Sequence, residues 1–146
     1  MVAPIFIDRA TGNIQIGDLA LLKPNDAKAS VEPQIATLLA GSRDHGNGYE
    51  WLDLLGLTFG GEVAALSLCF HDARLCQASW GVQLPGVPME GGWPSKKEID
   101  DEISFVRKIL AKEMGIKPGK MAWGDVWCQF DSRGYIASNG LRYRGS

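Results

Sequence analysis

The sequence has no excess of basic residues and no long apolar run. Its 146 residues carry 15 basic and 17 acidic side chains, which give a net charge of −2. Nucleic acids and anionic membranes are recognised by clustered positive charge, so we predict that neither is a partner. No run approaches the roughly 18 apolar residues of a membrane span, and the N-terminus lacks a signal-peptide pattern, so we expect a cytoplasmic protein.

Residues that carry metal or nucleophilic chemistry are scarce. The three cysteines, which are odd in number and lack paired spacing, are Cys69, Cys76 and Cys128. They suggest neither a disulfide framework nor a zinc motif. The dipeptide His71-Asp72 would need further ligands to hold a metal, and His45 is the only other histidine. Cys69 lies two residues from His71, but no glycine elbow or helix N-terminus activates its thiol. We therefore predict no catalytic residue, no metal site and no cofactor.

The segment from Ser95 to Gly115 has the most consistent local signals in the chain. Ser95 and Glu98 form a capping box at its start, and Gly115 can adopt the left-handed conformation that ends a helix. Apolar side chains recur at helical spacing along one stripe, namely Ile99, Ile103, Val106, Leu110 and Met114. We predict a long amphipathic helix with one buried face.

The rest of the chain alternates short β-rich segments with turns. The length, with 45% hydrophobic and 22% charged residues, is typical of one globular domain, which we place at 1–144. We expect Gly145 and Ser146 to be a cloning remnant. The predicted fold class is α+β, with a mostly antiparallel twisted sheet of five to seven strands. One long helix, about 95–115, packs on one face, and a short helix at about 30–40 begins at Ser30. The expected strands are 5–8, 13–16, 49–59, 62–71, 75–84, 122–130 and 135–143. A polar, glycine-rich loop is expected at 41–48, and a connection broken by proline and glycine at 85–94.

Apolar alternation also predicts the register of two hairpins. A three-residue turn between strands 62–71 and 75–84 would pair Ala64, Leu66, Leu68 and Phe70 with Val82, Trp80, Ala78 and Cys76. This register turns Cys69 away from Cys76, so we predict no disulfide between them. In the last hairpin, a turn at Ser132, Arg133 and Gly134 would place Asp131 opposite Tyr135.

The second register would gather aromatic residues on one face of the last hairpin. These are Trp123, Trp127, Tyr135 and Tyr143, interleaved with Asp125, Gln129 and Asn139. Large amphipathic aromatics dominate protein-binding hot spots, and sugars or bases can also stack on them. The alternative is that the rings close the second side of the sheet. We predict that this aromatic face, together with Asp125, forms part of a partner-binding surface. The rest of the surface would come from two loops, which carry Arg43, Asp44, His45, Glu90 and Trp93.

An acidic run begins the long helix, with Glu98, Asp100, Asp101 and Glu102. Such a run could dock a basic partner. Acidic residues in a first helical turn also complement the positive end of the helix dipole, which requires no partner. Both interpretations stay open at the level of sequence.

The C-terminal half resembles a known class of protein. A loop broken by proline and glycine and a capped helix precede Trp123-Gly124-Asp125-Val126, Phe130-Asp131, Gly134-Tyr135-Ile136 and Leu141-Arg142-Tyr143. This layout resembles the small immunity proteins encoded beside bacterial type VI and polymorphic toxins. The likeness is one of size and arrangement, and it transfers no functional residue. It implies a non-enzymatic inhibitor that binds a cognate toxin and occludes its active site.

Two other functions are compatible with the same residues. A small-molecule or sugar-binding domain, or a weak hydrolase, could use the aromatic face with Asp125 as its polar group. A homodimer could instead bury that face between two copies of the chain.

Overall fold

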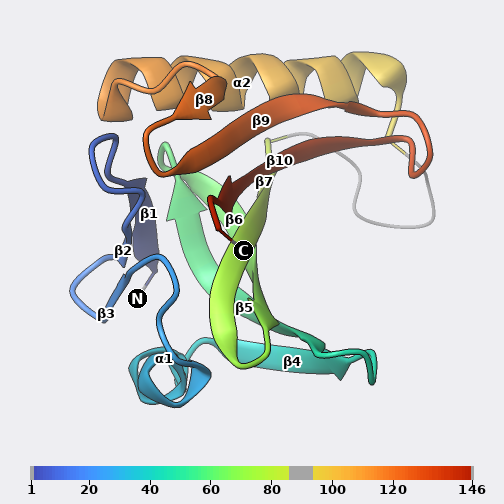
Figure 1. The fold of residues 1–146 in the computed structure, drawn as a ribbon. Helices are drawn as coiled ribbons and strands as arrows, with labels where there is room; N and C mark the ends of the chain where they lie inside the picture. Colours follow the sequence, from blue (N-terminus) through green and yellow to red (C-terminus); the bar gives the residue numbers. More distant parts are fainter. Residues whose placement is uncertain (1, 86–93, 146) are drawn as a thin grey trace.

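The protein is described here by a computed structural model that covers residues 2–85 and 94–145. Within these residues it forms an α+β fold with a mostly antiparallel sheet (Figure 1). The helices are α1 (Lys28–Ile35) and α2 (Lys96–Met114). The strands are β1 (Ala3–Ile7), β2 (Ile14–Ile16), β3 (Ala20–Leu22), β4 (Leu39–Asp44), β5 (Tyr49–Phe59), β6 (Glu62–His71), β7 (Arg74–Gln83), β8 (Gly119–Met121), β9 (Gly124–Asp131) and β10 (Ile136–Tyr143).

The sheet has ten strands in the described residues, so the expectation of five to seven is too low. The additional strands are short or exposed. Strands β3 and β8 have three residues each, which is too few for a visible alternation. Strand β4 occupies a segment that we predicted as helix end and polar loop. Its residues are almost all exposed, and pairing with β5 rather than apolar patterning makes it a strand.

Helix α1 is shorter than the predicted segment 30–40 and begins earlier. Its N-cap is Ala27 rather than Ser30, and its C-cap is Ala36. Val31 and Ile35 are its buried residues. The residues beyond it turn into β4, where they pair with β5.

The strand order is β3-β2-β1-β5-β6-β7-β10-β9-β8, with β4 also paired to β5. Strand β1 runs parallel to β5 and pairs with it at Leu57 and Thr58, whereas β4 pairs with the earlier half of β5. The register of β5 against β6 shifts between Leu54 and Leu57, around Gly56 with φ 80°. One long strand therefore joins the N-terminal strands to the central meander.

The turn between β6 and β7 has two residues rather than the predicted three. His71 pairs with Arg74, and the intervening Asp72 and Ala73 have φ 49° and 63°. Two consecutive positive φ angles are the signature of a type I′ turn, whose twist suits a hairpin.

The predicted apolar pairing nevertheless holds over most of this hairpin. Ala64, Leu66 and Leu68 face Val82, Trp80 and Ala78, as expected. The register shifts at a bulge between Cys69 and Phe70. On the turn side of this bulge, Phe70 pairs with Leu75 instead of Cys76, and on the other side the predicted pairs form. Cys69 faces Gln77, and both cysteines are free thiols. Burial of one apolar face therefore fixes the register, and the bulge accommodates the turn.

The register predicted for the last hairpin is wrong by one residue. Asp131 pairs with Ile136, and Tyr135 belongs to a four-residue loop, with φ 51°. The observed register places Leu141 opposite Val126, and Tyr143 joins the same face. Both side chains become part of the core. A glycine-based turn prediction failed because burying two large apolar side chains outweighs local turn preference.

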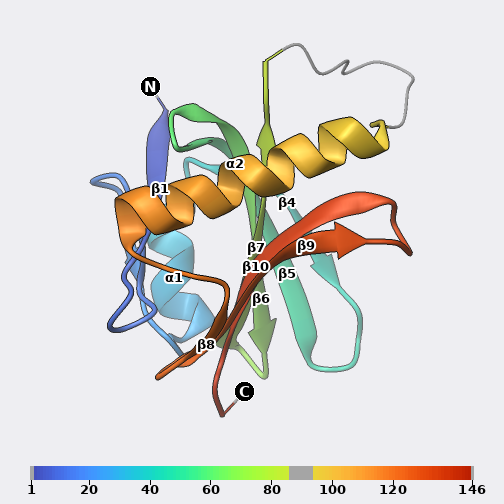
Figure 2. The same cartoon turned by 90° about the horizontal axis from the view of Figure 1, so that it is seen from above.

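Helix α2 matches the prediction from sequence. Ser95 and Glu98 form the capping box, and Gly115, with φ 67°, donates its N–H to Leu110. The apolar stripe is buried, and α2 lies against β7, β9 and β10. Figures 1 and 2 show the helix crossing this part of the sheet. Neither helix in the described ranges is long and apolar enough to cross a membrane.

Tyr143→Phe tests the observed register. The Tyr143 side chain is 2% exposed, and its hydroxyl donates a hydrogen bond to the buried Gly12 carbonyl at 2.6 Å. Removing the hydroxyl leaves this carbonyl without its donor, so we expect a loss of about 1–2 kcal/mol in the free energy of unfolding, measured in urea. The control is Tyr135→Phe, at an exposed position. Equal stability of both variants and wild type would contradict the register.

Candidate functional site

One face of the central sheet carries no helix or strand from the described residues. Along each strand, side chains buried beneath α2 and the N-terminal elements alternate with side chains on this other side. We call these positions on β4–β7, β9 and β10 the open face. In Figure 1 its strands run between β4 at the bottom and β9 near the top. The open face is therefore the main uncovered surface to examine for function.

A hydrogen-bonded cluster of polar groups lies where β4, β5 and β6 meet on the open face. Arg43 forms an ion pair with Asp53 at 2.9 Å, and Ser67 donates to the same Asp53 oxygen at 2.7 Å. The Arg43 guanidinium also lies over the Trp51 ring, 5.4 Å from its centroid. Of the three predicted residues in this region, Arg43 belongs to the open face. Asp44 and His45 continue into the exposed hairpin end, where Asp44 accepts from Gly46.

The predicted aromatic surface does not exist as one patch. Tyr143 lies in the core, where burial raises the pKa of its hydroxyl. Trp123 is half-buried beside it, with ring centroids 5.8 Å apart, and donates its indole N–H to the Arg9 carbonyl. A Cβ at Gly12 would lie 2.5 Å from the Trp123 ring, so the indole packs directly on this glycine. Trp123 and Tyr143 therefore pack against the N-terminal turn.

The other predicted aromatic residues stay accessible but lie apart. Trp127 is half-buried on the open face, where it packs on Gly140 and donates to Ser138 at 3.0 Å. Tyr135 is exposed at the end of the hairpin and contacts Phe130 edge-on, with centroids 5.3 Å apart. Asp125 is also exposed. Glu90 and Trp93 lie outside the described residues.

A gap opens in the sheet between β7 and β10. Their pairing ends at Trp80 and Asn139, and the strands then separate. Glu102 of α2 inserts its carboxylate there, where one oxygen accepts from the Val82 amide at 3.2 Å and from Asn139 Nδ2 at 3.0 Å. Asn139 is 1% exposed and also donates to the Trp80 carbonyl. Burial raises the pKa of Glu102, although these two hydrogen bonds favour its charged form.

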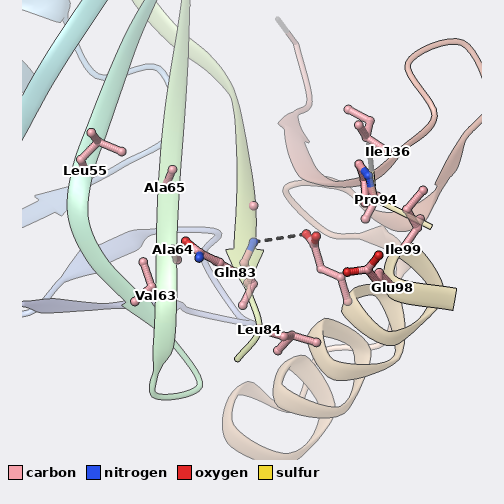
Figure 3. A pocket seen from close by; sticks show the side chains of 14 residues that line it. Leu55, Val63, Ala64, Ala65, Gln83, Leu84, Pro94, Glu98, Ile99 and Ile136 are labelled. Carbon is pink, nitrogen blue, oxygen red and sulfur yellow. Dashed lines mark hydrogen bonds between the residues drawn. The ribbon is translucent and has the colours of Figure 1, made fainter. Parts of the chain in front are cut away.

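A pocket of about 510 Å³ lies beside this gap (Figure 3). Leu55 and Val63 form one wall, and Ile136, Glu98 and Ile99 lie on the other, as the figure shows. Glu102 also lines it. The aliphatic side chains are accessible, with exposed fractions of 56% for Leu55, 60% for Val63 and 45% for Ile136. The pocket thus combines an apolar mouth with two carboxyl groups.

Sequence reasoning missed the aliphatic residues of this pocket, whereas Glu98 and Glu102 belong to the acidic run that it considered for docking. Leu55 and Val63 occupy positions where alternation calls for solvent exposure, and this signal was available in the sequence. The register predicted for the last hairpin would place Ile136 on the same face as Val126, Cys128 and Phe130, which is the covered face. Residues of β5, β6, β7, α2 and β10 form the pocket, so only the tertiary structure brings them together.

The chemistry of the described residues offers few reactive groups. Among them, no cluster of three His, Cys, Asp or Glu side chains could hold a metal ion. All three thiols are buried, and burial raises the pKa of Cys69 to about 12. These thiols remain protonated at neutral pH and are poor nucleophiles.

Comparisons with known proteins support the fold. No protein-family model matches the sequence, and a search of curated proteins finds no match. Among solved structures, the chain is similar to one in "Rhs1-CT in complex with cognate immunity protein RhsI1", with a TM-score of 0.58 and 12% identity. The alignment covers 96% of this chain and 87% of that chain. At this identity the likeness concerns the fold, which is immunity-protein-like.

Glu102→Gln tests the carboxylate in the sheet gap. Burial raises the pKa of Glu102 above its ordinary value, so the folded protein holds this proton more tightly than the unfolded chain. The protonated Glu102 carboxyl stabilises the folded protein fully below the pKa of this group in the unfolded chain, which is near 4.3. This stabilisation is lost as the pH rises through the higher pKa of Glu102 in the folded protein. We expect the free energy of unfolding of wild type, minus that of Glu102→Gln, to fall as the pH rises above about 4.

Urea denaturation at several pH values measures this difference. Glu113→Gln, at an exposed position of the same helix, controls for the loss of a carboxyl group. A difference that rises with pH would show that the gap favours the charged carboxylate, which contradicts the effect of burial.

Proposed function

We propose that this protein is a non-enzymatic cytoplasmic inhibitor of the immunity type, which binds a cognate bacterial toxin and occludes its active site. The immunity-protein-like fold supports this function. The observation that carries the proposal is the aliphatic mouth of the pocket on the open face. Leu55, Val63 and Ile136 are all accessible there.

Exposed aliphatic residues are informative when they gather at one place. Single apolar side chains are common on protein surfaces, but a contiguous apolar patch beside polar groups marks an interaction site. Leu55 and Val63 lie on the solvent side of strands that already bury their other face, so neither serves the core. A partner side chain that enters the pocket would remove these residues from water, which favours association.

The polar part of the open face would form the rim of the interface. Arg43, Asp53, Ser67 and Trp51 are already linked to one another, so little ordering is needed when a partner binds. Interfaces often combine such a polar rim with an apolar centre. The accessible residues predicted from sequence belong to the proposed surface, namely Arg43, Asp44, His45, Asp125, Trp127 and Tyr135.

Binding of a small molecule is a second candidate, favoured by the size of the pocket. Its volume of about 510 Å³ lies within the range typical of ligand sites. A metabolite that binds the folded protein would raise its melting temperature, and the rise would grow with the concentration of the metabolite. Homodimerisation stays a prediction, which the mass of the protein in solution would test.

Leu55→Arg and Val63→Arg test the proposed interface. Each puts a bulky positive charge into the apolar mouth, so we expect affinity for the toxin encoded by the adjacent gene to fall at least about tenfold by calorimetry. Circular dichroism should show an unchanged fold, because both positions are exposed. Leu21→Arg is the matched control, since Leu21 is 45% exposed on β3, outside the open face. Wild-type affinity in both pocket variants would remove the pocket from the interface.

A further inference from the structure

The two carboxyl groups of the pocket lie one helical turn apart. Glu98 and Glu102 are at positions i and i+4 of α2, which places them on the same side of the helix, and both line the pocket. Each uses one oxygen in the fold. Glu98 accepts from the Ser95 amide in the capping box, and Glu102 accepts from Val82 and Asn139.

The neighbouring charges of α2 are already paired. Lys96 contacts Asp100 at 2.6 Å, and Lys97 contacts Asp101 at 2.9 Å. Within residues 2–85 and 94–145, neither Glu98 nor Glu102 has a basic partner. Residues 86–93, which join β7 to α2 in the sequence, contain no Lys, Arg or His. Within the described residues, neither carboxylate therefore takes part in an ion pair.

The opposite wall of the pocket suits an aliphatic stem. Leu55 and Val63 face the helix across the pocket, and Ile136 lies on the same side of the pocket as Glu98 (Figure 3). Arginine and lysine carry such a stem and end in a cation, so one side chain can contact both parts of the lining. We infer that the pocket accepts an arginine or lysine side chain of the bound protein, with its charged end beside Glu98 and Glu102. This inference rests on the proposed function and names the chemistry of the partner.

Other occupants are less compatible with the lining. A neutral apolar side chain would displace water from the two carboxylates without replacing their hydrogen bonds, which is costly. An acidic side chain would be repelled by both. The positive end of the α2 dipole favours anions, but the Ser95 and Glu98 capping box already satisfies it.

Small probes test this chemistry on the full chain without the toxin. We expect n-butylguanidinium to cause saturable NMR shifts of the Ala65, Gly81 and Ile99 amides, which line the pocket. The neutral analogue n-butylurea has a similar shape and should bind at least about tenfold more weakly, because it lacks the charge. Equal binding of the two probes, or the absence of localised shifts, would overturn the inference.

The double variant Glu98→Gln, Glu102→Gln identifies the charges responsible. Glutamine at position 98 can keep the capping box, so α2 should remain intact. The preference for n-butylguanidinium over n-butylurea should disappear in this variant and persist in the control Glu113→Gln. A preference that survives in the double variant would assign the selectivity to other groups and overturn the inference.

Toxin binding separates the failure of this inference from the failure of the proposed function. We expect the double variant to lose at least about tenfold in affinity for the toxin, as for the loss of a partly buried charge pair. If Leu55→Arg abolishes binding while the double variant binds as wild type, the inferred basic side chain is disproved and the proposed interface is supported. If Leu55→Arg binds as wild type, the proposed interface fails, and any cation preference of the probes belongs to a small-ligand site.

Discussion

The interruption of the β7 and β10 pairing is the constraint on which the rest of the structure depends. Beyond Trp80 and Asn139 the two strands separate, and the Val82 amide loses its place in the ladder. The Glu102 carboxylate accepts a hydrogen bond from this amide and from the buried Asn139 side chain. A buried amide without a partner would destabilise the fold, so a polar residue of α2 is needed at this point. The same separation leaves space for the pocket.

Helix α2 therefore has two roles in the proposed function. Its apolar stripe covers β7, β9 and β10, which accounts for most of its length. Its first two turns bring Glu98 and Glu102 to the pocket, opposite the exposed aliphatic residues of β5 and β6. The acidic run that could be explained by the helix dipole alone thus divides into two groups. Asp100 and Asp101 pair with lysines, whereas Glu98 and Glu102 face the pocket.

Local signals predicted some of the fold and little of the site. The capping box, the apolar stripe and Gly115 all lie within one segment, so α2 could be predicted from sequence. Alternation predicted most of the β6 and β7 pairing because one face is buried. Alternation failed for β4, whose exposed residues show no such pattern. The turn predicted from Gly134 was wrong because the observed register buries Leu141 and Tyr143. The pocket depends on a gap between strands, which no local pattern records.

The proposed function requires that the toxin contacts the pocket on the open face. Methyl cross-saturation NMR, with saturation transferred from the toxin to the methyl groups of this protein, measures the contact directly. We expect strong transfer to Leu55, Val63 and Ile136, and none to Leu19 and Leu21, which are exposed at the N-terminal strands. Strong transfer to Leu19 and Leu21 with none to the pocket residues would contradict it.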